Sequence, residues 1–173
     1  MRIFVALRPS EAFRRALSVL QDRLREAGVA GRYLDPSSLH LTLAFIGEWQ
    51  DNIASLLPAV DSPFSIVLSC LGFFPEAKVL WAGTESSEDL NRLAGRVRQN
   101  LAEKGIPFDA KKFTPHITLV RKPVIPEGKI LSEISIPPAS MIVDEVCLYR
   151  SDHEENGMVY SVIGSTLRTS GES

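Results

Sequence analysis

The stretch Leu39-His40-Leu41-Thr42-Leu43-Ala44-Phe45-Ile46 decides the fold, because its central tetrad returns later as His116-Ile117-Thr118-Leu119. The chain holds three histidines, and two of them open such a His-x-Thr-Leu tetrad inside an apolar run. Side chains alternate between the two faces of a strand, so residues two apart point the same way. We therefore expect each histidine to lie beside its threonine on one face. The apolar residues of the tetrads should face a core on the other side: Leu41, Leu43, Ile117 and Leu119.

A repeated order of elements surrounds the two tetrads. Strands are expected at 2–7, 39–46, 64–73, 79–84, 113–120, 141–149 and 159–167. Amphipathic spacing predicts one helix from Ser10 to Gly28 and another from Ser86 or Ser87 to Gly105, with a short helix between Asp51 and Pro58. Polar turns are expected at 35–38 and 152–157, and the tail 169–173 has nothing to anchor it. The order strand, helix, turn, tetrad strand thus occurs twice, which predicts an α+β protein whose two similar halves each supply one tetrad to a cleft.

Length and composition predict one domain over 1–173, built as two intimate lobes, since 173 residues that are 45% hydrophobic can bury a real core. The formal net charge of -2 argues against a protein that coats nucleic acid, which needs a basic face. It permits one that grips a single phosphate or a nucleic-acid end. Cys70 and Cys147 lack metal-ligand or redox spacing, so we interpret them as buried thiols of a reducing compartment. The apolar run at 2–7 is too short for a signal-peptide core, and no run is long enough to span a membrane, so we expect a cytoplasmic protein.

Residues near the tetrads permit both structural and functional interpretations. No acidic residue or further histidine stands at metal-ligand spacing from His40 or His116, so we expect no metal and no other cofactor. The aromatic residues near the tetrads can either pack in the core or stack on a nucleobase: Phe4, Tyr33, Phe45 and Trp81. The lysines are expected on a solvated face, with some steering of phosphate: Lys111, Lys112 and Lys122. His153 is assigned to a polar turn without a role.

Five segments together resemble the 2H phosphoesterase superfamily, and in particular the bacterial and archaeal RNA 2′,3′-cyclic phosphodiesterases, first described as 2′-5′ RNA ligases. They are RIFVAL, LHLTLAFIGE, LGFFPEAKVLWAG, FTPHITLVR and VCLYRS, and they cover nearly the whole chain in the family's order. The resemblance implies a bilobal α+β fold with antiparallel sheets around a central groove, and a metal-independent site. It also implies that His40 donates a proton, that His116 accepts one, and that Thr42, Thr118 and Arg121 bind substrate. One departure is Arg8-Pro9-Ser10, where the family often has an acidic residue or asparagine.

The residues and the resemblance together predict hydrolysis of RNA or oligonucleotide 2′,3′-cyclic phosphate ends, and of cyclic nucleotides, to 2′-phosphomonoesters by a monomeric enzyme. Histidine suits both proton transfers because its pKa lies near neutrality. Preorganised donors such as the threonines and Arg121 would stabilise charge on the phosphate oxygens. Two alternatives stay open: ligation of a cyclic end to a 5′-hydroxyl at the same site, and a non-catalytic module that binds RNA ends or nucleotides.

Overall fold

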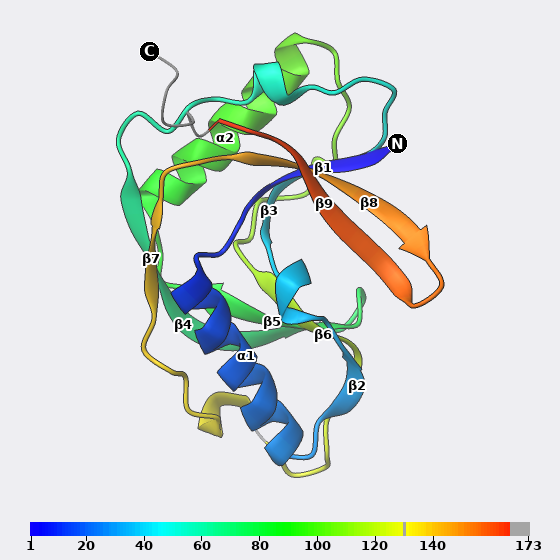
Figure 1. Cartoon of the computed structure of the whole chain (residues 1–173). Helices are drawn as coiled ribbons and strands as arrows, with labels where there is room; N and C mark the ends of the chain where they lie inside the picture. Colours follow the sequence, from blue (N-terminus) through cyan, green and yellow to red (C-terminus); the bar gives the residue numbers. More distant parts are fainter. Residues whose placement is uncertain (130, 167–173) are drawn as a thin grey trace.

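The computed structural model describes residues 1–129 and 131–166, and these residues form two antiparallel sheets with one long helix against each (Figure 1). The four-stranded sheet has the order β3-β1-β8-β9, and the five-stranded sheet has the order β2-β6-β5-β4-β7. The first sheet consists of β1 (Arg2–Leu7), β3 (Leu41–Glu48), β8 (Cys147–Glu154) and β9 (Gly157–Ser165). The second consists of β2 (Ala30–Tyr33), β4 (Phe64–Phe74), β5 (Val79–Thr84), β6 (Ile117–Val124) and β7 (Ser140–Val143). Each sheet therefore contains one tetrad, which confirms the predicted α+β fold with antiparallel sheets.

Both long helices begin where the sequence predicts. Helix α1 (Glu11–Glu26) is capped by Ser10, whose hydroxyl accepts a hydrogen bond from the Phe13 amide at 3.2 Å. Helix α2 (Glu88–Glu103) is capped in the same way by Ser87, which accepts from the Leu90 amide at 3.1 Å. A serine hydroxyl at this position satisfies an amide that has no partner inside the helix. Three short 3-10 helices complete the described elements: Pro36–Ser38, Ala54–Leu56 and Leu131–Glu133.

Each helix packs against the sheet that contains the tetrad of the other half. Helix α1 follows β1, yet its buried Gln21 donates to the carbonyl of Leu119 in β6 at 3.1 Å. Helix α2 follows β5, yet Arg98 Nε donates to the carbonyl of Leu43 in β3 at 3.1 Å. In Figure 1, α2 accordingly lies with the four-stranded sheet above and α1 with the five-stranded sheet below. The two sequence repeats are thus interleaved in space, since the helix of each repeat packs against the sheet that contains the tetrad of the other.

The last tetrad residues, Leu43 and Leu119, are each an extra residue in a strand. Val5 pairs with Ala44 and Ala6 with Thr42, so Leu43 has no partner in β1. Leu80 likewise pairs with Val120 and Trp81 with Thr118, which leaves out Leu119. A carbonyl beside such a bulge can lose its ladder partner, and a buried carbonyl without a hydrogen bond is costly. The side-chain donors on α1 and α2 therefore stabilise the two bulges.

The structure differs from the sequence predictions about strands and turns in four respects. The expected strand 141–149 is two strands, β7 and β8, because the chain leaves the five-stranded sheet at Val143 and enters the other at Cys147. The expected polar turn 152–157 is largely a hairpin, in which Glu154 already pairs with Gly157. Strand β2 was not expected at all. Both tetrad strands begin one residue after their histidines, at Leu41 and Ile117. The predicted tail 169–173 lies outside the described residues.

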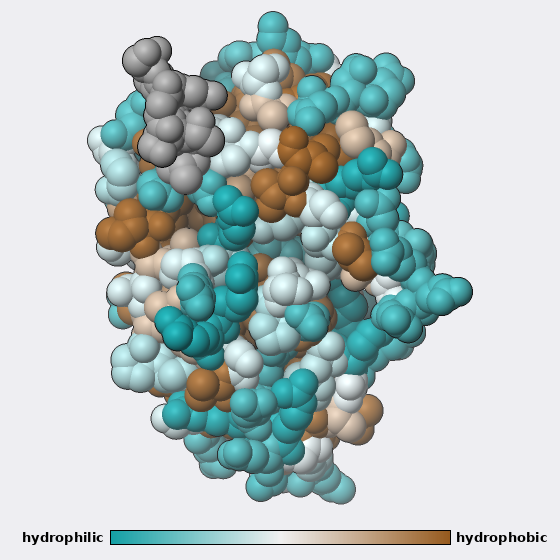
Figure 2. Space-filling view, in the orientation of Figure 1, coloured by the Kyte–Doolittle hydropathy of each residue, from teal (hydrophilic) through white to brown (hydrophobic). Residues whose placement is uncertain are grey.

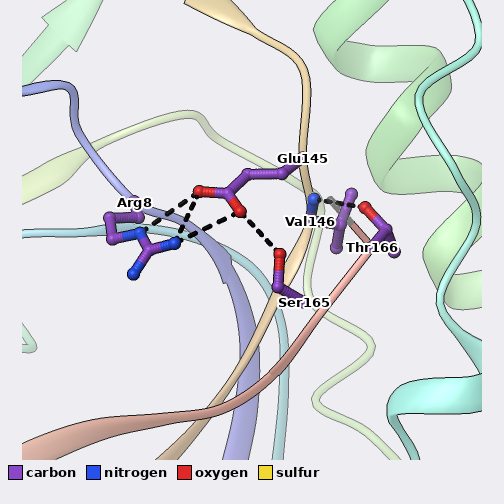
Figure 3. Close-up of polar contacts among 5 residues, drawn as sticks. All are labelled: Arg8, Glu145, Val146, Ser165 and Thr166. Carbon is purple, nitrogen blue, oxygen red and sulfur yellow. Dashed lines mark hydrogen bonds and ion pairs between the residues drawn. The ribbon is translucent and has the colours of Figure 1, made fainter. Parts of the chain in front are cut away.

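The crossing between the two sheets is held by a polar cluster (Figure 3). Arg8, at the end of β1, binds both carboxylate oxygens of Glu145 at 2.9 and 3.2 Å, and Ser165 donates to the same carboxylate at 2.5 Å. The Val146 amide donates to the hydroxyl of Thr166 at 2.9 Å. This cluster explains the departure at Arg8-Pro9-Ser10, because Arg8 joins β1 to the crossing segment and to the end of β9.

The core lies between the sheets and the helices, and it receives the predicted tetrad residues. The four apolar tetrad residues are at most 1% exposed: Leu41, Leu43, Ile117 and Leu119. Cys147 is buried as expected, but Cys70 is exposed, because an extra residue in β4 between Leu68 and Cys70 turns its side chain outward. The face of the molecule seen in Figure 2 is mostly hydrophilic, with scattered rather than continuous apolar patches. No helix within 1–129 and 131–166 is long and apolar enough to cross a membrane.

Candidate active site

A groove of about 1460 Å³ between the two sheets receives both tetrads. His40 and Thr42 of the first tetrad line it, together with His116 and Thr118 of the second. Arg121 lines the same groove. The structure therefore brings together all five residues that the sequence predicts for the site, on the face opposite the core.

Both histidines are oriented by the same backbone contact. His40 Nδ1 lies 2.7 Å from the carbonyl of Ser38, and His116 Nδ1 lies 2.7 Å from the carbonyl of Thr114. A carbonyl oxygen only accepts hydrogen bonds, so Nδ1 of each ring carries the proton. In the neutral ring the free lone pair is then on Nε2. Each imidazole is thus prepared to accept a proton at Nε2 or, once charged, to donate one from there.

The bulges at Leu43 and Leu119 decide which residues after each tetrad face the groove. In a regular strand, Thr118 and Arg121 would point to opposite faces, since they are three residues apart. The extra residue Leu119 restores Arg121 to the face of Thr118. In β3 the extra residue Leu43 does the same for Phe45, which is 36% exposed and lines the groove. Arg121 and Phe45 are therefore equivalent positions of the two halves with different chemistry.

His40 stands among three aromatic rings of the four-stranded sheet. The ring centroids of Phe4, Tyr160 and Tyr149 lie 4.6, 5.2 and 5.5 Å from that of His40. Burial by these rings lowers the pKa of His40 to about 4, and the Ser38 carbonyl opposes this shift. Charge repulsion from Arg121, and from His116 whenever that ring is charged, adds to the lowering. His40 is therefore neutral at pH 7 in the unliganded protein.

His116 has a more open environment on the five-stranded sheet. Its ring meets Phe74 edge-on with centroids 5.1 Å apart, and Trp81 at 6.0 Å. Trp81 is the register partner of Thr118, so it packs beside the second tetrad on the neighbouring strand. Phe74 ends β4 and lines the groove itself. The second tetrad thus has two steeply inclined aromatic neighbours, without the three-ring enclosure around His40.

Arg121 connects the two sheets across the groove. Its guanidinium Nη2 lies 3.5 Å from the hydroxyl of Tyr160, which stands on β9 of the other sheet. The Arg121 side chain is exposed and forms no ion pair among residues 1–129 and 131–166. A planar guanidinium without a carboxylate partner is well suited to a phosphate.

The structure also decides between the interpretations of nearby residues. Phe4 is 3% exposed and packs in the core beneath His40, while Tyr33 bonds to the Val29 carbonyl and lies under Arg25 rather than in the groove. Phe45 is the one predicted aromatic that offers an exposed ring in the groove. Of the three lysines, Lys111 and Lys112 line the groove and Lys122 does not.

The sequence does not single out several residues that line the groove or enclose His40, among them Phe74, Tyr149, His153 and Tyr160. His153 lines the groove because β8 extends to Glu154, so its assignment to a polar turn is wrong. Tyr149 and Tyr160 lie more than 100 residues beyond His40 along the chain. Tyr149 stands in the VCLYRS segment of the resemblance, but nothing in that segment links it to His40. The available signal is the pair of strands expected at 141–149 and 159–167, but it does not say which sheet these strands join. Within the described residues, no group of three or more His, Cys, Asp or Glu side chains is placed to hold a metal ion.

Together these groups form an acid–base site for an anion. Two imidazoles expose Nε2, two threonine hydroxyls stand beside them, and Arg121 supplies a fixed positive charge. Such donors stabilise negative charge that develops on non-bridging oxygens, while the imidazoles move protons.

Comparisons with known proteins agree with this arrangement. The model of the 2'-5' RNA ligase superfamily matches residues 9–155. An RNA 2',3'-cyclic phosphodiesterase from Thermotoga maritima is 29% identical over 94% of this chain and 93% of its own length. The crystal structure of LigT from E. coli in apo form superposes with a TM-score of 0.76 at 28% identity and covers 95% of each chain. The LigT structure complexed with 3'-AMP superposes with a TM-score of 0.74 at 29% identity, again over 95% of each chain.

Proposed function

The chain belongs to the 2'-5' RNA ligase superfamily, and from this premise we propose that it hydrolyses RNA 2′,3′-cyclic phosphate ends to 2′-phosphomonoesters. The observation that carries the proposal is the pair of histidines whose Nδ1 atoms are held by backbone carbonyls, with Nε2 free, in one groove with Arg121. The names of the relatives support the substrate class.

In the proposed reaction, Arg121, Thr42 and Thr118 bind the cyclic phosphate between the two imidazoles. Water attacks phosphorus and gives its proton to Nε2 of His116. The bond from phosphorus to the ribose 3′-oxygen breaks, and Nε2 of His40 donates a proton to that oxygen. The products are a 2′-phosphomonoester and a 3′-hydroxyl. Each positioned proton transfer contributes roughly 10²–10⁴ in rate.

The low pKa of His40 places a condition on this assignment. A proton donor must be charged before the reaction, yet His40 is neutral at pH 7 in the unliganded protein because its pKa is about 4. An anionic phosphate between Arg121 and His40 offsets positive charge that lowers this pKa and stabilises the charged imidazole directly. We therefore propose that substrate binding itself charges His40.

The assignment of the two roles is tested with a cyclic substrate whose 3′-oxygen is replaced by sulfur, a leaving group that needs no proton. We expect His40→Ala to regain most of its lost rate on this substrate and His116→Ala to remain slow. Recovery by His116→Ala instead would reverse the two roles. Recovery by neither variant would assign both histidines to phosphate binding.

The function itself is tested by turnover of nucleoside and oligonucleotide 2′,3′-cyclic phosphates, with the product isomer identified by chromatography. We expect the 2′-phosphate, and no turnover by a His40→Ala, His116→Ala double variant. Binding without turnover by the native chain would favour the non-catalytic module. Supplying a 5′-hydroxyl oligonucleotide tests ligation, in which that hydroxyl replaces water; we expect hydrolysis to dominate because water is the more abundant nucleophile.

We further propose that the protein acts in the cytoplasm as a single-domain monomer. Both tetrads of the groove come from one chain, so a second copy adds nothing that the reaction needs. Each long helix packs against the sheet containing the other half's tetrad, which supports treating the two lobes as one domain. The free thiols of Cys70 and Cys147 support a reducing compartment. Sedimentation of the purified chain would test the oligomeric state.

A further inference from the structure

Two arginines stand side by side where the groove meets the edge of the five-stranded sheet. Arg32 of β2 is the register partner of Arg121 of β6. Partners in an antiparallel pair project from the same face, with Cβ atoms roughly 5 Å apart. Both side chains are exposed, and both line the groove. Like charges directly opposite each other destabilise a sheet, so this placement needs an explanation.

No carboxylate in residues 1–129 and 131–166 forms an ion pair with either arginine. Asp152 lines the same groove, but its carboxylate accepts from Arg150 Nε at 3.0 Å. Arg98, another cation of the groove, is in contrast occupied, since it donates to the backbone carbonyls of Leu43 and Lys111. Arg32 and Arg121 are therefore a pair of guanidinium groups left without an anion.

The backbone around Arg32 has unusual conformations that allow β2 to lie close to β6. Gly31 has φ +143°, and a Cβ there would lie 2.8 Å from Val120 Cγ1, so glycine allows β2 to press closely against β6. On the facing strand Lys122 has φ 48°, a conformation that costs a residue with a side chain roughly 1–3 kcal/mol. The register shift between Ala30 and Arg32 occurs at the same place. Three local irregularities thus meet where Arg32 is set opposite Arg121.

We propose that Arg32 binds the phosphodiester on the 5′ side of the terminal nucleotide while Arg121 binds the cyclic phosphate at its 3′ end. This inference rests on the proposed function and specifies its substrate as an oligonucleotide rather than a free cyclic mononucleotide. Two consecutive phosphates of one strand are separated by a single nucleoside. Long side chains that start from neighbouring strands can spread to reach both, and guanidinium groups bind phosphate oxygens through paired donors.

The test compares a dinucleotide that ends in a 2′,3′-cyclic phosphate with the corresponding mononucleoside cyclic phosphate. We expect Arg32→Ala to raise KM about tenfold for the dinucleotide, the effect of losing one charged hydrogen-bonding partner, and by less than about threefold for the mononucleoside. A dinucleotide with an uncharged methylphosphonate linkage should show the same tenfold loss with the native chain and no further loss with Arg32→Ala. The matched control is Arg15→Ala, which removes an exposed arginine of α1 that does not line the groove.

Equal losses on both substrates would overturn the proposal, because Arg32 would then act on the cyclic phosphate. A mononucleoside cyclic phosphate with a 5′-phosphate distinguishes a terminal phosphate from a linkage. If it depends on Arg32 as strongly as the dinucleotide does, the oligonucleotide assignment is wrong. If the native chain turns over neither substrate, the proposed function fails instead. The Arg32 site is then tested by calorimetric binding of a dinucleotide 3′-phosphate, which Arg32→Ala should weaken about tenfold.

Discussion

The tetrad strand β3 and the tetrad strand β6 are built alike and surrounded differently. In each, the histidine precedes the strand and its Nδ1 meets the carbonyl two residues earlier. In each, the fourth tetrad residue is an extra residue, and its carbonyl accepts from a long helix of the other half. The local framework of the site is therefore close to symmetric.

The surroundings break that symmetry. His40 is enclosed by Phe4, Tyr149 and Tyr160, which lowers its pKa to about 4, whereas within 1–129 and 131–166 His116 has two aromatic neighbours, Phe74 and Trp81. At the equivalent position after the bulge, one half has Phe45 and the other has Arg121. The comparison teaches that a duplicated framework can place two identical acid–base groups, while unequal neighbours assign them different chemistry.

The largest expected effect removes one histidine at a time. Because each imidazole moves a proton in the proposed reaction, His40→Ala and His116→Ala should each lower kcat by roughly 10²–10⁴. Single-turnover rates on an oligonucleotide 2′,3′-cyclic phosphate measure this loss directly. His153→Ala is the matched control, since His153 lines the groove and has no assigned proton transfer. A loss below about tenfold for either tetrad histidine would contradict a two-histidine mechanism.

The next effect compares the equivalent positions Arg121 and Phe45. Arg121→Ala removes the fixed charge facing the phosphate and should lower kcat/KM by roughly 10²–10³, as loss of a transition-state donor does. Phe45→Ala should cost less than about tenfold and act mainly on KM, since one stacked base contributes roughly 1–3 kcal/mol at most. Steady-state kinetics of the two variants side by side decide the matter. Comparable losses in kcat for the two variants would contradict the assignment of phosphate binding to Arg121 and of base stacking to Phe45.

A third experiment sharpens the difference between the two histidines through stability. The folded-state pKa of His40 is lowered from 6.5 to about 4, so the stability it contributes is present above pH 6.5 and is lost as pH falls toward 4. Since the ring is partly exposed to the groove, we discount the full shift and expect a loss of about 2 kcal/mol between pH 7.5 and 4.5. Urea unfolding of the native chain and of His40→Gln at both pH values should show that the variant loses about 2 kcal/mol less. Identical losses would contradict the buried, neutral state of His40.

The smallest expected effect concerns metal removal. If the two imidazoles carry both proton transfers, excess EDTA should change kcat by less than about twofold. Activity that is lost in EDTA and restored by a divalent cation would contradict the two-histidine mechanism, because the histidines would then be candidate metal ligands.

The two-histidine mechanism also predicts a bell-shaped pH profile of the rate, since one imidazole must be charged while the other is neutral.

Much of the fold follows from local patterns that the sequence carries openly. Ser10 and Ser87 cap the two long helices as predicted, because a cap depends on residues within one turn. The strands 2–7 and 79–84 have the predicted bounds, since their apolar runs are short and well delimited. The prediction of one strand over 141–149 is wrong because a hydrophobic run does not show where the chain passes from one sheet to the other. The crossing at Asp144-Glu145-Val146 depends on Arg8 and Ser165, which are distant along the chain.

By itself the sequence determined the two tetrads, the faces of their residues, and the five groups His40, Thr42, His116, Thr118 and Arg121. These follow from strand alternation and from a family resemblance, and both depend on the amino-acid sequence alone. Only the tertiary structure decided that Tyr149 and Tyr160 enclose His40, that Arg32 stands opposite Arg121, and that each helix packs against the other half's tetrad strand. The physical reason is that pKa values and charge pairs depend on distances through space. Strand pairing brings together segments that are far apart along the chain, and the residues of one segment do not identify its partner.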